Sequence, residues 1–230
     1  MTTSLKFISL CCLFLFVLPQ NADAQRRGKR IKQRFRASLI AGFNLSQMDG
    51  DNYNGFDKFN TQFGIGGTAI INHYSEIGIE LLYHSKGART ESDPRRTINR
   101  KDRLVDLNYM EIPFFYRYNR TGGAPGIFFE FGGAFARLID ARVNEPDMVL
   151  DGLVIRGLED DFNNNELSLL LGLGHHFTEH IGARIRYSFA LTRVYHTDDL
   201  SDQAVLQIEQ ERGLTQLRNY YISLAAFYRF

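Results

Sequence analysis

Six charged residues lie in segments where polar and apolar side chains alternate, a pattern that sends successive side chains to opposite faces of a strand. They are three glutamates and three arginines, namely Glu80, Glu111, Glu130, Arg117, Arg184 and Arg186. Carboxylates and guanidinium groups enclosed in a narrow space form bidentate ion pairs. Buried charged groups of this kind also serve as ion or proton paths in some membrane proteins. We therefore expect these residues to form one ion-pair network, with an ion or proton path as the alternative.

The elements that must position these charges are strands. In 181–191, Ile181, Ile185 and Phe189 share an apolar face, while Arg184 and Arg186 share the other. The same alternation predicts eight strands, at 34–46, 61–72, 76–86, 104–118, 126–136, 166–177, 181–191 and 219–230. Each has 11 to 15 residues, and a tilted strand needs about 9–11 to cross a bilayer. We place no charged residue on the outward faces.

The connections between these strands run 14, 3, 17, 7, 29, 3 and 27 residues, alternately long and short. Outer-membrane barrels have short periplasmic turns and longer external loops. A soluble β-sandwich can also show alternation, but the strand lengths and the connections favour a barrel. The sequence thus predicts an all-β domain over 34–230: an eight-stranded antiparallel transmembrane β-barrel in the outer membrane, with both termini periplasmic.

Residues 1–25 have the features of a secretory signal peptide: Lys6, an apolar run from Phe7 to Pro19, and Ala-Asp-Ala before Gln25. Both cysteines lie in this segment, so the mature chain can form neither a disulfide nor a cysteine-ligated metal site. Segment 26–33 is basic, and we expect a solvated periplasmic tail or one attracted to anionic lipid or a periplasmic partner. The balance of 27 basic and 26 acidic residues argues against a nucleic-acid partner.

Other candidate sites have weak patterns. His175 and His176 are adjacent on a strand, so only one can face the lumen and metal ligation is disfavoured. The segment from Asp49 lacks the glycine and the final glutamate of a calcium loop. A histidine and two aspartates at the outer rim, His196, Asp198 and Asp199, have no serine elbow beside them. We expect no metal, no cofactor and no enzymatic activity.

The last predicted strand alternates to its final residue and carries Tyr228 and Phe230 on its apolar face. Aromatic residues at such positions form the interfacial girdles of membrane barrels. An alternating strand that ends in phenylalanine resembles the signal that bacterial barrel-assembly machinery reads on its clients. This resemblance implies that the assembly machinery is a partner during biogenesis.

Three further stretches carry a family resemblance: "AGFNLS" at 41–46, "IGIELLYHSKGAR" at 77–89 and "LNYMEIPFFYRY" at 107–118. They resemble the PorT-like outer-membrane β-barrel family typical of Bacteroidota. The resemblance implies an outer-membrane location and this barrel fold. Most members have no defined function, and although the name-giving branch is tied to type IX secretion and gliding, nothing in these residues picks out that branch.

We therefore expect an integral outer-membrane barrel whose lumen is plugged by side chains and whose role is structural or interactive, through its external loops. A narrow channel, or a component of a transport or secretion apparatus, is the alternative. Expected partners are outer-membrane lipid, the assembly machinery and a loop-binding protein or surface ligand.

The alternating connections predict a topology that can be tested on whole cells. Epitopes inserted in 87–103, 137–165 or 192–218 should be accessible to antibody, whereas an epitope at 121–124 should not. Labelling at Gly122 in intact cells would show that the orientation is reversed.

Overall fold

The computed structural model describes residues 34–49, 58–90, 103–122, 125–144, 162–194 and 218–230. These contain eight strands: β1 (Phe35–Asp49), β2 (Lys58–Ile70), β3 (Ser75–Thr90), β4 (Arg103–Asn119), β5 (Gly126–Asn144), β6 (Asn165–His176), β7 (Ile181–Ala190) and β8 (Arg218–Arg229). The predicted signal peptide and basic segment lie outside the described residues. No helix in the described ranges is long and apolar enough to cross a membrane.

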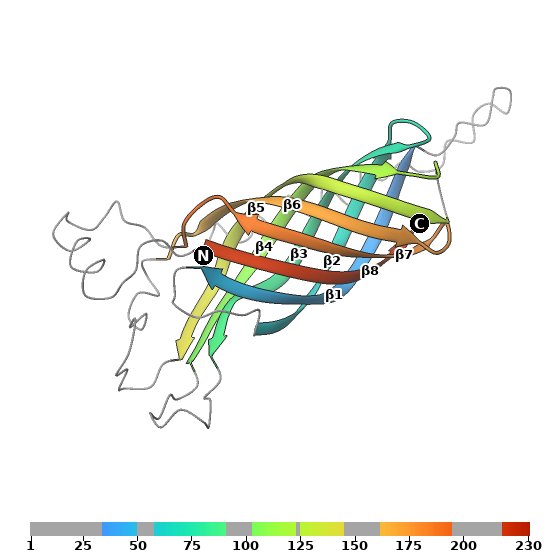
Figure 1. The fold of residues 1–230 in the computed structure, drawn as a ribbon. Helices are drawn as coiled ribbons and strands as arrows, with labels where there is room; N and C mark the ends of the chain where they lie inside the picture. Colours follow the sequence, from blue (N-terminus) through green and yellow to red (C-terminus); the bar gives the residue numbers. More distant parts are fainter. Residues whose placement is uncertain (1–33, 50–57, 91–102, 123–124, 145–161, 195–217) are drawn as a thin grey trace, which may run out of the picture. The chain divides into compact units, whose positions relative to one another are not determined.

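The strands form one closed antiparallel barrel in which each strand pairs with its sequence neighbours and β1 pairs with β8 (Figure 1). We call the end with the connections 71–74, 120–125 and 177–180 the turn end, and the opposite end the loop end. Strand β1 starts and β8 finishes at the turn end, where Ser38 pairs with Arg229. The predicted fold class is confirmed.

Alternation along each strand separates two environments. On β6 and β7 the outward Leu171 and Ile185 are 58% and 53% exposed, whereas the inward Arg186 is 1% exposed. Leucine, isoleucine and phenylalanine dominate the outward positions all round the barrel. An apolar surface of this extent is far larger than a water-soluble monomer exposes. The outer wall is therefore built to meet lipid.

Strand β5 is longer than the alternation predicts, because a bulge changes the phase of its side chains. Asn108 pairs with Asp140 but Tyr109 pairs with Leu138, which leaves Ile139 as an extra residue. Up to Ala136 the even-numbered residues of β5 face inward, and beyond the bulge the odd-numbered residues do. The simple alternation therefore ends near Ala136. The strand itself continues to Asn144.

Strands β3, β4 and β5 project past the rest of the barrel at the loop end (Figure 1). Pairing of β2 with β3 reaches only Gln62 and His84, and pairing of β5 with β6 begins at Arg137 and Asn165. By contrast, β3 and β4 pair to Thr90 and Arg103, and β4 and β5 pair to Leu104 and Asn144. The barrel wall thus continues as a three-stranded sheet.

The projecting sheet also corrects the expectation that outward faces carry no charge. Asp106 lies on the outward side of β4, where its side chain is 30% exposed. Lys58 Nζ at the start of β2 donates to Asp106 Oδ1 and to the carbonyl oxygen of Lys86, both at 2.5 Å. A charged outward residue is acceptable here because it lies on the projecting sheet and has a cationic partner.

The outward face gives a prediction whose control lies on the same strand. Ile185→Arg, at mid-strand, should destabilise the folded barrel in lipid by about 2–4 kcal/mol, because a lipid-facing arginine near the bilayer midplane costs that much. Ile181→Arg, on the same face at the turn end, should cost about 0–1 kcal/mol, since the cost falls toward the interface. Urea titration of the barrel in phospholipid vesicles measures both, and equal costs would contradict the placement of β7 in the membrane.

Candidate functional site in the barrel lumen

Four strands bring six charged side chains together in the lumen, and we call this group the arginine cluster. Its members are Glu76 and Glu80 from β3, Arg117 from β4, Glu130 from β5, and Arg184 and Arg186 from β7. Each is at most 4% exposed. Arg117 pairs with Glu76 and Glu130 across adjacent strands, whereas Arg184 and Arg186 reach across the lumen to Glu80. The cluster therefore ties opposite walls together.

The hydrogen bonds of the arginine cluster are short and partly bidentate. Arg184 donates from Nη1 and Nη2 to the two oxygens of Glu80, at 2.5 and 2.8 Å. Arg186 donates to Glu80 at 2.9 Å and to Glu130 at 2.7 and 3.2 Å. Arg117 donates to Glu130 at 2.6 and 2.9 Å and to Glu76 at 3.1 Å. Within the cluster, three carboxylates balance three guanidinium groups.

Two more arginines approach this cluster from the turn end. Arg36 on β1 and Arg229 on β8 lie 3.6 and 3.7 Å from Glu76 Oε1, which is beyond hydrogen-bond distance. Arg229 Nε and Nη1 are buried without a hydrogen-bond partner among the described residues. The turn end of the lumen is thus more basic than its middle.

Aromatic rings and glycines shape the space around the arginine cluster. Arg117 lies 4.5 Å from the ring centre of Phe128, and Arg186 lies 5.0 Å from that of Phe115, both within cation–π range. A Cβ atom at Gly172 would lie 3.1 Å from Glu130 Oε2, so a larger residue there would crowd the carboxylate that Arg186 binds. Aromatic rings and close glycine contacts thus surround the ion pairs.

A second group, which we call the lysine cluster, lies nearer the loop end. Its charged members are Lys86 on β3, Glu111 on β4 and Glu166 on β6. Lys86 Nζ donates to both carboxylates at 2.6 Å. Tyr221 donates to the free oxygen of Glu111 at 2.6 Å. All of these side chains are at most 5% exposed.

Further polar side chains complete the lysine cluster. His84 Nε2 lies 3.2 Å from Glu111 Oε2, and Asn44 Nδ2 lies 2.9 Å from His84 Nδ1. Asn219 Nδ2 donates to Glu166 Oε2 at 2.6 Å. The two carboxylates are therefore bound by β3 and β8 residues, and Asn44 on β1 binds the histidine.

The sequence predicted one network, and the structure contains two. Glu80, Glu130, Arg117, Arg184 and Arg186 lie together as expected, but Glu111 belongs to the lysine cluster. Alternation showed correctly that Glu111 faces inward, but it does not show how far along the barrel axis the residue sits. On β4, Glu111 is six residues closer to the loop end than Arg117, and this distance puts it beside Lys86.

Several lumen residues were missed although the same periodicity could have found them. Glu76, His84 and Lys86 share the inward phase of Glu80 on β3, and Glu166 shares the inward phase of β6. Lys86 and Glu166 are end residues of the expected strands 76–86 and 166–177. In the structure the lumen remains closed at their level, so both are buried.

Apolar side chains cover the lysine cluster at the loop end. The cluster of Met48, Val105, Leu107, Tyr109 and Ala136 is joined by two residues outside the strands, Phe162 and Val194, all at most 3% exposed. Asn163 N donates to the carbonyl oxygen of Val194 at 2.6 Å, which holds these two short segments together. From turn end to loop end, the lumen is filled by the arginine cluster, the lysine cluster and this apolar layer.

Strands β1 and β8, which pair with each other, contribute few charged side chains to the lumen. Between Arg36 and Met48 the inward residues of β1 are Ser38, Ile40, Gly42, Asn44 and Ser46, and between Arg218 and Arg229 those of β8 are Asn219, Tyr221, Ser223, Ala225 and Phe227. None is charged. The hydrogen-bonded ion pairs of the arginine and lysine clusters come from β3, β4, β5, β6 and β7.

The two adjacent histidines of β6 lie on opposite faces of the wall. His176 is 1% exposed inside the lumen, with its ring 4.5 Å from that of Phe128. His175 is partly exposed on the outer wall. Among the described residues no group of three or more His, Cys, Asp or Glu side chains is placed to hold a metal ion.

The aromatic residues of the predicted assembly signal lie on the outer wall at the turn end. Tyr228 and Phe230 are 44% and 57% exposed, and their ring centres are 5.1 Å apart. The ring of His180 stacks on Tyr228 at 5.8 Å. Residues 50–57 of the calcium-like segment, and the rim residues His196, Asp198 and Asp199, lie outside the described residues.

Solved structures with a similar fold come from several bacteria. Ail, the attachment invasion locus protein of Yersinia pestis, has 12% identity and a TM-score of 0.43, with 86% of this chain and 99% of that chain covered. OprG of Pseudomonas aeruginosa has 12% identity and a TM-score of 0.39, covering 86% and 96%. Neisserial surface protein A has 11% identity and a TM-score of 0.43, covering 85% and 97%. No curated protein sequence matches the chain.

The family comparison covers nearly the whole chain. Residues 8–230 match the family described as Outer membrane protein beta-barrel domain. The closed barrel, the apolar outer wall and the polar lumen agree with that description. The chain belongs to the outer membrane protein beta-barrel domain family and is located in the outer membrane.

Proposed function

We propose that this barrel is closed by its own lumen side chains and acts as a structural or interaction protein through its loop end. The observation that carries the proposal is the arginine cluster, in which Arg184 and Arg186 span the lumen to Glu80 and Glu130 at hydrogen-bond distance. In an eight-stranded barrel the interior is just wide enough for side chains to fill. Charges that bind one another across this width leave little room for water or ions to pass.

The other layers support the same conclusion. Each carboxylate of the lysine cluster is held by Lys86 and by at least one further donor. A conducting pore would instead keep its charged groups hydrated, as the water-filled lumens of porins do. The apolar layer at the loop end adds a cover that ions would have to cross without ligands.

The projecting sheet is the part of the described chain best suited to reach a partner outside the membrane. In β5, Ile139 is 56% exposed although it lies beyond the last pair with β6. Nearby Arg142 is exposed and its Nε lies 2.8 Å from Asp140 Oδ2. Such a mixed apolar and charged surface suits a protein or surface ligand, with the external loops as the remainder of the contact.

We further assign the chain to the PorT-like group within its family, on the three stretches at 41–46, 77–89 and 107–118. The barrel-assembly machinery is a partner during insertion, through Tyr228 and Phe230 on the last strand. We propose no enzymatic activity and no cofactor. A narrow channel or a role in transport or secretion is the competing function, and conductance distinguishes it from a closed barrel.

Planar-bilayer recordings test closure directly. The unmodified protein should pass little current, because both ion-pair clusters fill the lumen. A variant that removes facing members of the arginine cluster, Glu80→Ala with Arg184→Ala and Arg186→Ala, should pass more current once a space is opened. Steady, large-conductance channels from the unmodified protein would overturn the closed-barrel proposal and favour the channel.

Stability measurements test whether the arginine cluster is one electrostatic unit. Arg184→Ala should lower the free energy of unfolding by about 3–5 kcal/mol, because it removes the bidentate partner of a buried carboxylate. Adding Glu80→Gln should recover part of the loss, since the stranded charge disappears.

The lysine cluster supplies the matched control for this experiment. Adding Glu111→Gln to Arg184→Ala should recover nothing, because Glu111 binds Lys86 and Tyr221 instead. Urea unfolding in lipid vesicles measures all variants under the same conditions. Equal recovery by Glu80→Gln and Glu111→Gln would show that the two clusters are not separate.

A further inference from the structure

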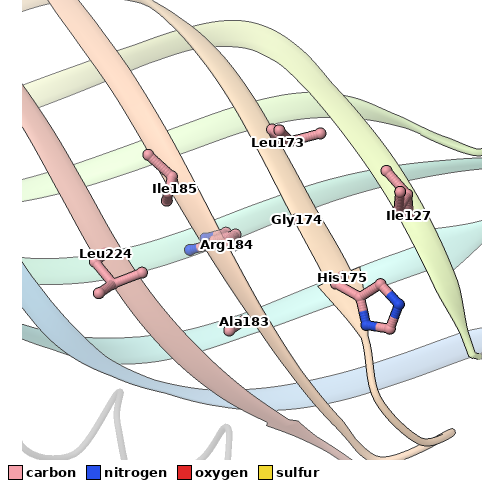
Figure 2. Close-up of a pocket in the computed structure, with 8 residues that line it drawn as sticks. All are labelled: Ile127, Leu173, Gly174, His175, Ala183, Arg184, Ile185 and Leu224. Atoms are coloured by element: carbon pink, nitrogen blue, oxygen red, sulfur yellow. The ribbon is translucent and has the colours of Figure 1, made fainter.

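The outer wall of the barrel has an apolar hollow of about 370 Å³ near the turn end. Figure 2 shows the side chains around it, which come from four adjacent strands: Ile127 on β5, Leu173 and His175 on β6, Ala183 and Ile185 on β7, and Leu224 on β8. Gly174 and Arg184 also line it, although the Arg184 guanidinium faces the lumen. The hollow lies at Ala183, whose side chain is much smaller than those around it.

The strand register places two further alanines in line with Ala183 on the outer wall. Ala183 on β7 pairs with Ala226 on β8, and Ala226 pairs with Ala41 on β1. Ala226 and Ala41 are exposed and Ala183 is partly exposed. His175 pairs with Ala183 at one end of this row, and Phe63 pairs with Ala41 at the other. We call the row of three alanines, with its two end residues, the alanine trough.

Large side chains flank the alanine trough on both sides. Toward the loop end the next outward residues are Leu173, Ile185, Leu224 and Phe43, which are neighbours in the register and 48–53% exposed. Toward the turn end they are Phe177, Ile181, Tyr228 and Leu39, which are 44–57% exposed. On each strand the two flanking residues are four positions apart, about 13 Å along a strand. Large apolar side chains therefore border the alanine row on both sides.

The one polar side chain in the outward lining of the hollow is His175, among the residues described. Its Nδ1 is buried and has no hydrogen-bond partner in the described parts of the chain. The residue is next to last in β6, and the Tyr228 and His180 rings lie at the same end of the wall. Aromatic side chains such as Tyr228 are enriched at the boundary between the lipid chains and their head groups.

We propose that the alanine trough is a binding site for one phospholipid of the periplasmic leaflet, with an acyl chain in the trough and its glycerol or phosphate oxygens at His175. A linear hydrocarbon chain fits a groove with a flat floor and apolar sides, and it gains van der Waals contact there that a smooth wall does not offer. The His175 imidazole supplies a hydrogen bond to an ester or phosphate oxygen at head-group level.

The position of the trough favours a lipid over a protein helix or a second barrel. It lies in the part of the wall that the membrane location puts in contact with lipid, and its outward lining carries no charged group that would need a partner. A second hollow of about 430 Å³, over Ala37, Gly67 and Ala69, lies at the same end of the barrel. Its outward side chains are all apolar, so it lacks the head-group contact that His175 gives the trough.

Photo-crosslinking and native mass spectrometry test this site with phosphatidylethanolamine as the probe. The purified full-length mature protein, in detergent with a phosphatidylethanolamine that carries a diazirine in its acyl chain, is irradiated and the modified peptides are mapped. Cross-links should concentrate on the trough and its flanks in β6, β7, β8 and β1. Native mass spectra with the unmodified lipid should show one retained lipid.

Three variants distinguish the trough from the rest of the wall. Ala226→Leu should lower retention about fivefold or more, because the added methylenes occupy the floor. His175→Phe should lower it about threefold, the effect of one hydrogen bond in a membrane. Thr61→Leu adds the same side chain to an exposed outward position of β2 outside the trough and should leave retention unchanged. Heat-modified gel mobility confirms that each variant is folded.

Two results would overturn the proposal. Retention that is the same in Ala226→Leu as in the unmodified protein would show that the lipid binds elsewhere. A barrel dimer in the native spectra that Ala226→Leu converts to monomer would show that a second copy of the chain occupies the trough. Neither outcome bears on lumen closure, which the conductance measurement tests separately.

Discussion

The narrow interior of an eight-stranded barrel is the constraint on which the rest of this structure depends. Half of every strand faces a space that is too small for a column of bulk water, so each inward polar group must find its partner among the other inward groups. Arginine meets this requirement well, because its planar fork binds carboxylates on two strands at once, as Arg186 does with Glu80 and Glu130. Phenylalanine rings fill the space that remains around the ion pairs, and glycines leave room for them.

The same constraint explains why the lumen is divided into layers. Arg117, Arg184 and Arg186 satisfy the carboxylates at their own depth, and Lys86 satisfies those closer to the loop end. An ion pair works only over a few ångströms in a packed interior, so charge has to balance locally and not merely over the whole chain. Tyr221 and Asn219 supply the hydrogen bonds that one lysine cannot give to two carboxylates.

Period-two alternation was enough to predict the fold, because in a membrane barrel the two faces of each strand meet such different surroundings. It placed all eight strands and gave the inward direction of Glu80, Glu111, Glu130 and Arg184. It could not give the depth of each residue, which depends on the register between strands, and so Glu111 was assigned to the wrong partners. The end of β5 was missed for a related reason, because one extra residue at Ile139 reverses the phase. The alanine trough also needed the register, since Ala41, Ala183 and Ala226 are far apart in the sequence.

The uneven distribution of charge around the wall has a consequence for how such a barrel closes. The first and last strands meet along the β1–β8 seam, and their inward residues at mid-wall are serine, asparagine, alanine, glycine, isoleucine, tyrosine and phenylalanine. Parting this seam breaks the backbone hydrogen bonds between β1 and β8 but no ion pair between their described residues, whereas parting β4 from β5 would also separate Arg117 from Glu130 directly. The seam is therefore one of the lines between neighbouring strands that no ion pair of the described residues crosses. A chain threaded strand by strand into lipid can pair Arg117 with Glu76 and Glu130 on the adjacent strands β3, β4 and β5 before its two ends join. The pairs of Arg184 and Arg186 with Glu80 cross the lumen, so they come together only as the cylinder closes.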